Sequence, residues 1–365
     1  MGVCEACPRH SQRGDITEKP DVLDDAVKIS ELDGEDMLSS IMSLPEHIVR
    51  GMQGNRIDIP YFKPENIVAC GMGGSAIAGE IASAWLSERL FIPFVENRNY
   101  DIPSFVSEKT LVLALSYSGN TYETLNMVRE ALNRKAVVVA ISSGGKLREI
   151  MEEEGGYFIE VPEGLQPRAA LGYLISAIGS VMKSLKIYDP EVELLNVGAL
   201  LKKMRKKLNP SVPLNENEAK KISVELKDTI PVIYSYGPYV SAANRWHTQI
   251  NENSKMLAFY GALTEMDHNE IVGWKDKADG FSAVFLRVDE NEILRTVTDF
   301  NKKTIKAAGG KTVDIEAEGE STLEKIMSLI YMGDFVSYYL AILRGIDPTP
   351  VDVITELKGN VRKVL

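Results

Sequence analysis

Short apolar runs alternate with longer segments of helical periodicity between residues 66 and 186. A short, continuously apolar run bounded by small residues is typical of a strand buried in a parallel sheet. The pattern predicts strands at Ile67–Cys70, Phe94–Asn97, Leu111–Leu115, Val137–Ser142 and Tyr157–Val161. Because helical segments separate these runs, the expected fold is α/β, with a doubly wound parallel sheet.

The same alternation returns in the second half of the chain. It predicts strands at Val232–Tyr236, Leu257–Tyr260, Phe281–Val288 and Thr312–Ile315, and helices at Tyr239–Lys255, Asn291–Ala308 and Ser321–Leu343. We therefore expect two similar α/β domains that face each other, formed by residues 41–188 and 216–365.

The remaining segments carry weaker signals. Residues 1–40 are expected to form an N-terminal extension followed by a lead-in helix, and residues 189–215 a helical connector. The C-terminal tail starts at Gly345, and its Asp347-Pro348-Thr349-Pro350 stretch is expected to break any helix because proline lacks a backbone N–H.

Composition excludes several classes of partner. The 365 residues include 52 acidic against 41 basic side chains, a net charge of −11, which argues against a nucleic-acid surface. From the sequence, no apolar stretch is expected to approach the 18 or more residues of a membrane span, and residues 1–30 lack the apolar centre of a secretory signal. The three cysteines are too few for a disulfide framework. A cytoplasmic protein that binds neither nucleic acid nor membrane is expected.

A metal site is not expected. Cys4 and Cys7, followed by His10, could suggest one, but a second cluster of ligands is absent and the segment is polar and terminal. The four histidines show neither H-x-H nor H-E-x-x-H spacing. We accordingly predict a protein without a cofactor.

Two predicted strands are followed by small polar residues suited to a phosphate. Gly74 and Ser75 follow the first strand, and Ser116, Ser118 and Thr121 follow the third. Glycine lets backbone N–H groups approach an anion, and hydroxyls at a helix N-terminus add donors. Neither a G-x-G-x-x-G motif nor a P-loop is present. Either segment alone could be only a tight turn, whereas the pair, at the carboxyl ends of parallel strands, favours a compact phosphomonoester.

Two acid–base candidates lie in the second half. Glu252, flanked by Asn251 and Asn253, could be a general base oriented by the neighbouring amides, although a water-exposed helix end would look the same. His268 lies among carboxylates in a loop-like segment and could shuttle a proton, although a lone loop histidine is commonly a surface residue.

Six segments in order resemble the archaeal-type bifunctional phosphoglucose/phosphomannose isomerases, a sugar isomerase (SIS) domain family. They are GMGGSAIAGE, SYSGNTYETL, QPRAALGYL, RWHTQINENSK, DHNEIVGW and DPTPVDVITELK. The resemblance covers the chain from about residue 40 to its end. It implies two SIS domains per subunit, a homodimer, and a sugar phosphate bound between the domains near the subunit boundary.

The resemblance also implies roles for individual residues. The five cradle residues, Gly74, Ser75, Ser116, Ser118 and Thr121, would hold the phosphate. Glu252 would move the proton between C1 and C2, and Arg168 would stabilise the cis-enediolate. His268, reaching in from the neighbouring subunit, and Lys358 would open the ring. Isomerisation of glucose 6-phosphate and mannose 6-phosphate to fructose 6-phosphate, without a metal, is the expected activity.

Two other functions fit SIS domains. The isomerase half of a glucosamine-6-phosphate synthase would follow a domain-sized glutaminase, and Cys4 and Cys7 do not begin one. A sugar-phosphate-sensing regulator would carry a basic helix-turn-helix, and the acidic chain offers no obvious one.

Overall fold

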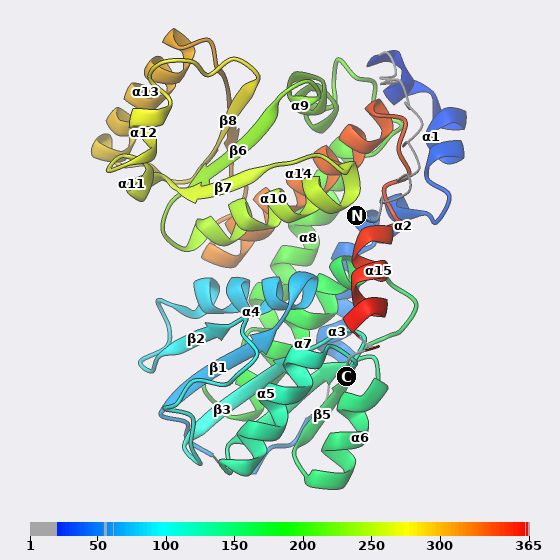
Figure 1. Cartoon of the computed structure of the whole chain (residues 1–365), viewed down its shortest axis with the longest axis vertical. Helices are drawn as coiled ribbons and strands as arrows, with labels where there is room; N and C mark the ends of the chain where they lie inside the picture. The colour runs from blue at the N-terminus through cyan, green and yellow to red at the C-terminus, as the bar shows by residue number, and fades with distance from the viewer. Residues whose placement is uncertain (1–19, 55–56, 61, 362, 364–365) are drawn as a thin grey trace, which may run out of the picture.

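The computed structural model describes residues 20–54, 57–60, 62–361 and 363. The candidate ligands Cys4, Cys7 and His10 lie outside the described residues. Figure 1 shows two α/β domains, one above the other, with α14 and α8 at their junction.

The first domain contains a parallel sheet of five strands in the order β2-β1-β3-β4-β5. The strands are β1 (Asn66–Gly71), β2 (Phe94–Asn97), β3 (Thr110–Leu115), β4 (Val137–Ser142) and β5 (Tyr157–Glu160). Successive residues enter different cores, because side chains alternate across a strand. Ile67 packs with helices α4 (Gly73–Leu86) and α7 (Leu171–Ser184), whereas Val68 packs with helices α5 (Tyr122–Asn133) and α6 (Gly145–Glu154).

The second domain contains a parallel sheet of four strands in the order β7-β6-β8-β9. The strands are β6 (Ile230–Ser235), β7 (Phe259–Ala262), β8 (Phe281–Arg287) and β9 (Lys311–Glu316). Its helices are α9 (Glu218–Leu226), α10 (Val240–Ser254), α11 (Leu263–Met266), α12 (Glu270–Gly273), α13 (Glu292–Ala307) and α14 (Thr322–Leu343). The α/β class and the parallel sheets predicted from the sequence are confirmed, with β7 beginning two residues later than expected.

The remaining helices lead into the first domain, connect the two domains or lie within them. They are η1 (Pro20–Asp24), α1 (Ala26–Leu32), α2 (Met37–Met42), α3 (Leu44–Gly54), η2 (Pro167–Ala170), α8 (Glu191–Leu208) and η3 (Gly237–Tyr239). Helix α8 contacts both α3 and α14, so the connecting segment is part of the packed core rather than a free linker. The exact domain boundaries given above stay predictions.

Helix α14 corrects the expectation that no segment has the length of a membrane span. By length and composition its 22 residues could cross a membrane, with a mean hydropathy of 1.6 in the most apolar window. That window is 94% buried inside the protein, against α8, α9 and α10. A helix that is apolar on all sides is buried on all sides, and here other parts of the chain bury it.

The C-terminal tail also differs from the prediction. Helix α14 already ends at Leu343, before the Asp347–Pro350 stretch, and a further helix, α15 (Asp352–Val361), follows that stretch. None of its residues is buried, although Val353, Leu357 and Val361 are apolar. Figure 1 shows α15 beside the junction of the two domains.

Replacing Gly333 by alanine should destabilise the protein. Gly333 lies on α14 where a Cβ would stand 2.4 Å from the indole nitrogen of Trp246, which donates a 2.7 Å hydrogen bond to the Leu329 carbonyl. Overpacking and the displaced hydrogen bond should together lower the free energy of unfolding by about 2–4 kcal/mol, measured by urea denaturation. Gly273→Ala, where a Cβ meets nothing within 4 Å, is the control. A loss below about 1 kcal/mol for Gly333→Ala would contradict the prediction.

Candidate active site

The two predicted phosphate segments meet at one edge of the first sheet. Strands β1 and β3 are hydrogen-bonded neighbours, with Gly71 opposite Leu115, so the residues after them are adjacent. The link is direct: the backbone N–H of Tyr117 donates to Ser75 Oγ at 3.0 Å. Ser116 Oγ donates to Thr121 Oγ1 at 3.1 Å, and Ser118 is exposed. The structure therefore brings together all five residues predicted to hold a phosphate.

Two helices begin at this point. The N-cap residues of α4 and α5 are Met72 and Thr121, and neither side chain caps its helix. The N–H groups in the first turn of a helix lack an intrahelical partner and can donate to an anion. The positive end of each helix dipole also favours an anion at this position. This geometry could hold the phosphate of a small monoester.

Arg168 lies next to this cradle. A Cβ on Gly74 would stand 2.9 Å from the Cα of Arg168, so only glycine lets α4 approach η2 this closely. The Arg168 guanidinium is buried, with 2% of the side chain exposed. Burial lowers the pKa of Arg168 below its usual range, and the negative charge of Glu252 offsets part of that change.

Every nitrogen of the Arg168 guanidinium has an acceptor. Nε donates to Asn253 Oδ1 at 2.8 Å, and Nη2 donates to the carbonyls of Pro348 and Thr349 at 2.9 and 2.8 Å. Nη1 forms an ion pair with Glu252 Oε2 at 3.5 Å. Arg168 thus connects the first domain, the end of α10 and the segment before α15 at one point.

Glu252 lies in the last turn of α10, with 25% of its side chain exposed. The expectation that the flanking asparagines orient it is wrong. Asn251 donates to the carbonyls of His247 and Ala258, and Asn253 donates to Ser337 Oγ. Adjacent residues on a helix do not face each other, so the orienting contact comes from Arg168 instead.

One face of α10 carries buried polar residues that contact the candidate site and that sequence reasoning missed. Arg245, Gln249 and Asn253 recur every four residues and are buried. Arg245 forms an ion pair with Asp334 of α14 at 3.2 Å and donates to the Arg168 carbonyl at 2.7 Å; Gln249 donates to Asp334 at 2.9 Å. Buried polar groups need such partners. The four-residue spacing of polar residues was the available signal.

The two remaining predicted residues lie apart. His268, between α11 and α12, is exposed, and Lys358 is exposed on α15. These elements are on opposite sides of the molecule in Figure 1. No hydrogen bond or ion pair joins either residue to Glu252 within the described part of the chain. Which groups open a sugar ring stays a prediction.

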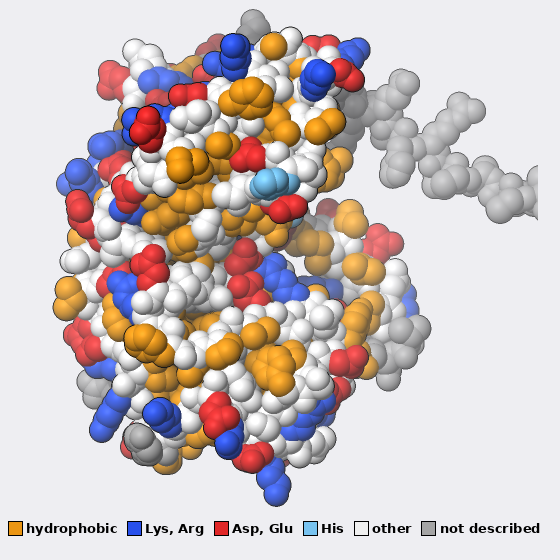
Figure 2. Space-filling view, turned by 90° about the vertical axis from the view of Figure 1, so that its left-hand side faces the viewer, with side chains coloured by type: hydrophobic (Ala, Val, Ile, Leu, Met, Phe, Trp, Pro, Cys, Tyr) orange, Lys and Arg blue, Asp and Glu red, His pale blue; other side chains and the backbone are white. Residues whose placement is uncertain are grey.

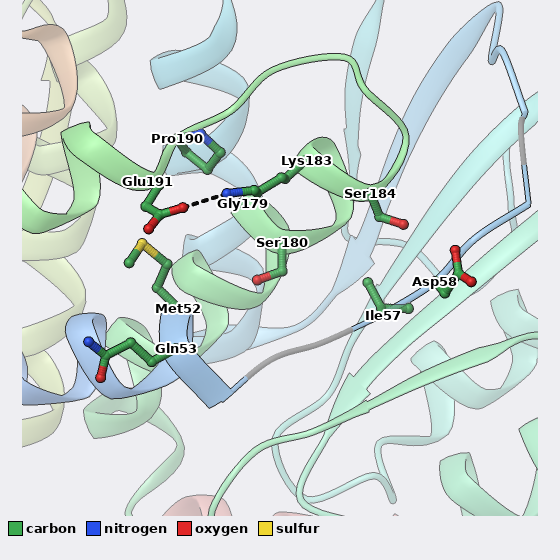
Figure 3. A pocket seen from close by; sticks show the side chains of 10 residues that line it. All are labelled: Met52, Gln53, Ile57, Asp58, Gly179, Ser180, Lys183, Ser184, Pro190 and Glu191. Carbon is green, nitrogen blue, oxygen red and sulfur yellow. Dashed lines mark hydrogen bonds and ion pairs between the residues drawn. The ribbon is translucent and has the colours of Figure 1, made fainter.

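One small hollow, of about 10 Å³, is lined in part by Arg168, Arg245 and Gln249, whereas the larger hollows include none of the predicted site residues. A cavity of about 680 Å³ is lined by residues of α3, α7 and α8 and their flanks, where Lys183 forms an ion pair with Glu191 (Figure 3). Figure 2 shows a notch between the two domains, with side chains of both charges nearby. Among the described residues, no group of three or more His, Cys, Asp or Glu side chains could hold a metal ion.

Comparison with known proteins decides the family. Residues 61–152 match the SIS domain, and residues 215–361 match the bacterial phospho-glucose isomerase C-terminal SIS domain. A bifunctional phosphoglucose/phosphomannose isomerase of Caldicellulosiruptor bescii is 38% identical over 90% of this chain and 99% of its own. The chain belongs to the bifunctional phosphoglucose/phosphomannose isomerase family. The Aquifex aeolicus member of this family is 37% identical, over 82% of this chain and 91% of its own.

Solved structures outside this isomerase family share the fold. The C-terminal domain of glucosamine-fructose-6-phosphate aminotransferase from Francisella tularensis superposes with a TM-score of 0.68 at 19% identity, covering 86% of this chain and 98% of that one. At this identity the likeness concerns the fold alone. Membership of the bifunctional isomerase family makes the protein an enzyme, as predicted from the sequence.

Proposed function

We propose that the protein interconverts glucose 6-phosphate and mannose 6-phosphate with fructose 6-phosphate through a cis-enediolate, without a metal ion. The observation that carries the proposal is the Arg168–Glu252 ion pair at 3.5 Å, next to a cradle that Gly74 brings against Arg168. A carboxylate base, a cation for developing oxyanion charge and a phosphate anchor are the parts that aldose–ketose isomerisation requires. The curated relatives with this activity in their names support the same substrates.

Each residue has a distinct role in this proposal. The cradle residues bind the phosphate and so fix the sugar chain. Glu252 removes the proton from C2 of the aldose and returns it to C1, while a hydroxyl proton moves between O1 and O2. Arg168 stabilises the negative charge on the enediolate oxygen. Because the enediolate is planar, protonation of C2 from either face gives glucose or mannose 6-phosphate, provided that the site allows rotation about C2–C3.

Ring opening completes the sequence. Lys358 and His268 would serve as acid and base at the hemiacetal. His268 would come from the neighbouring subunit of a homodimer, a proposal supported by the separation of its loop from α15 in Figure 1. We place the activity in the cytoplasm.

The test is turnover of glucose 6-phosphate and mannose 6-phosphate to fructose 6-phosphate by protein treated with EDTA. We expect both sugars to react at the rate of untreated protein, because the proposed groups are all side chains and backbone amides. Loss of turnover that added Zn²⁺ restores would contradict metal independence. Reaction of glucose 6-phosphate alone would exclude the mannose activity, and binding without turnover would favour a sugar-phosphate sensor.

A further inference from the structure

Lys255 ends α10 in an unusual conformation. Its backbone has φ 51° and ψ 40°, the left-handed region in which helix ends usually place glycine. A side chain in this conformation is strained. The residue follows Glu252 by three positions, so its placement bears on the proposed catalytic base.

The ammonium of Lys255 contacts four backbone carbonyls, although the residue as a whole is exposed. Nζ is 2.8 Å from the Glu252 carbonyl and 3.3 Å from that of Asn253, both on α10. It is 3.0 Å from the Asp347 carbonyl and 2.9 Å from that of Pro348, both on the segment before α15. Desolvation, with repulsion from Arg168, lowers the pKa of Lys255 to about 8. An ammonium has three N–H donors, so these carbonyls satisfy it.

The backbone carbonyls of residues 347–349 accept hydrogen bonds from side-chain cations. Arg168 donates to the Pro348 and Thr349 carbonyls, so two cations bind three successive carbonyl oxygens. Prolines at 348 and 350 lack backbone N–H groups and fix their own φ angles. Helix α15, which carries Lys358, begins at Asp352, and none of its residues is buried. The hydrogen bonds from Arg168 and Lys255 therefore fix residues 347–349, just before the first residue of α15.

We propose that Lys255 is a positioning residue, which ties the segment before α15 to the end of α10 and so sets Lys358 relative to Glu252. The inference rests on the proposed function for the roles of these two residues. The hydrogen bonds of the Lys255 ammonium go to backbone carbonyls and not to the Glu252 carboxylate. Its loss should therefore affect the arrangement of the catalytic groups and leave the phosphate cradle of the first domain intact.

Lys255→Gly is the decisive variant, because glycine adopts the left-handed backbone without strain. We expect kcat to fall at least about tenfold while KM changes less than about threefold. The melting temperature should stay within about 3 °C of wild type. Lys255→Arg, which keeps a cation, should recover most of kcat. Lys135→Gly is the matched control, since Lys135 also has a positive φ, of 62°, and is exposed after α5.

Hydrogen exchange measures the position of α15 independently of activity. Amides of residues 351–361 should exchange faster in Lys255→Gly than in wild type or Lys135→Gly. Unchanged exchange and a kcat within twofold of the control would overturn the inference, as would an arginine variant as impaired as the glycine variant. A wild-type protein without isomerase activity would overturn the proposed function. The exchange data would still test whether Lys255 fixes the segment before α15.

Discussion

Replacing Glu252 by glutamine is expected to lower kcat for both sugar phosphates by about 10³-fold, within the range for loss of a general base. The amide has nearly the shape of the carboxylate but cannot accept the C2 proton. The KM values should change little, because the phosphate cradle belongs to the other domain. Steady-state kinetics in both directions give the measurement.

The matched control is Glu218→Gln, which makes the same change on the exposed side of α9. It should leave kcat within about twofold of wild type. Proton exchange from C2 of the substrate into solvent should also disappear in Glu252→Gln. If this exchange persisted at the wild-type rate, another group would have to be the base.

Arg168→Lys should affect both stability and catalysis. Lysine keeps a positive charge but lacks the planar fork that reaches Asn253, Glu252 and two carbonyls. Breaking a buried ion pair with its hydrogen bonds should lower the free energy of unfolding by about 3 kcal/mol. We expect kcat to fall by about 10²-fold or more, because the donor for the enediolate oxygen is lost.

Urea denaturation and steady-state kinetics test these two effects separately. Arg148→Lys, whose residue is partly exposed on α6 and pairs with Glu160, is the control and should change neither quantity appreciably. An Arg168→Lys protein that is less stable but has wild-type kcat would show that Arg168 only holds the domains together. Wild-type stability with a low kcat would assign it to catalysis alone.

Local patterns along the chain were enough to predict the elements that carry the cradle. A buried parallel strand shows itself as a continuous apolar run, and Ile67 and Val112 lie in such runs. Since the carboxyl ends of parallel strands meet at one edge of a sheet, the sequence placed both predicted phosphate segments at that edge. The pairing of β1 with β3, which brings Ser75 to Tyr117, is seen only in the structure. Helix α15 was not predicted, because the prolines before it were taken to exclude a helix in the tail.

The roles of Arg168 and Lys358 came from the resemblance of ordered motifs, since each residue alone could be a surface cation. The structure places Arg168 in a buried network with Glu252. It does not bring His268 or Lys358 to the same point within one chain. Contacts between segments more than eighty residues apart, such as the Arg168–Asn253 hydrogen bond, leave no local periodicity in the sequence.

The sequence by itself determined the α/β class, the two domains and the family, and located the two adjacent segments predicted to bind phosphate, because each depends on short-range pattern or ordered motifs. Only the tertiary structure decided how Glu252 is oriented, that Arg245, Gln249 and Asn253 are buried against α14, and that Lys255 binds the segment before α15. The physical reason is that buried polar groups take their partners from wherever packing places them. Those partners lie on elements distant in the chain, which local patterns do not specify.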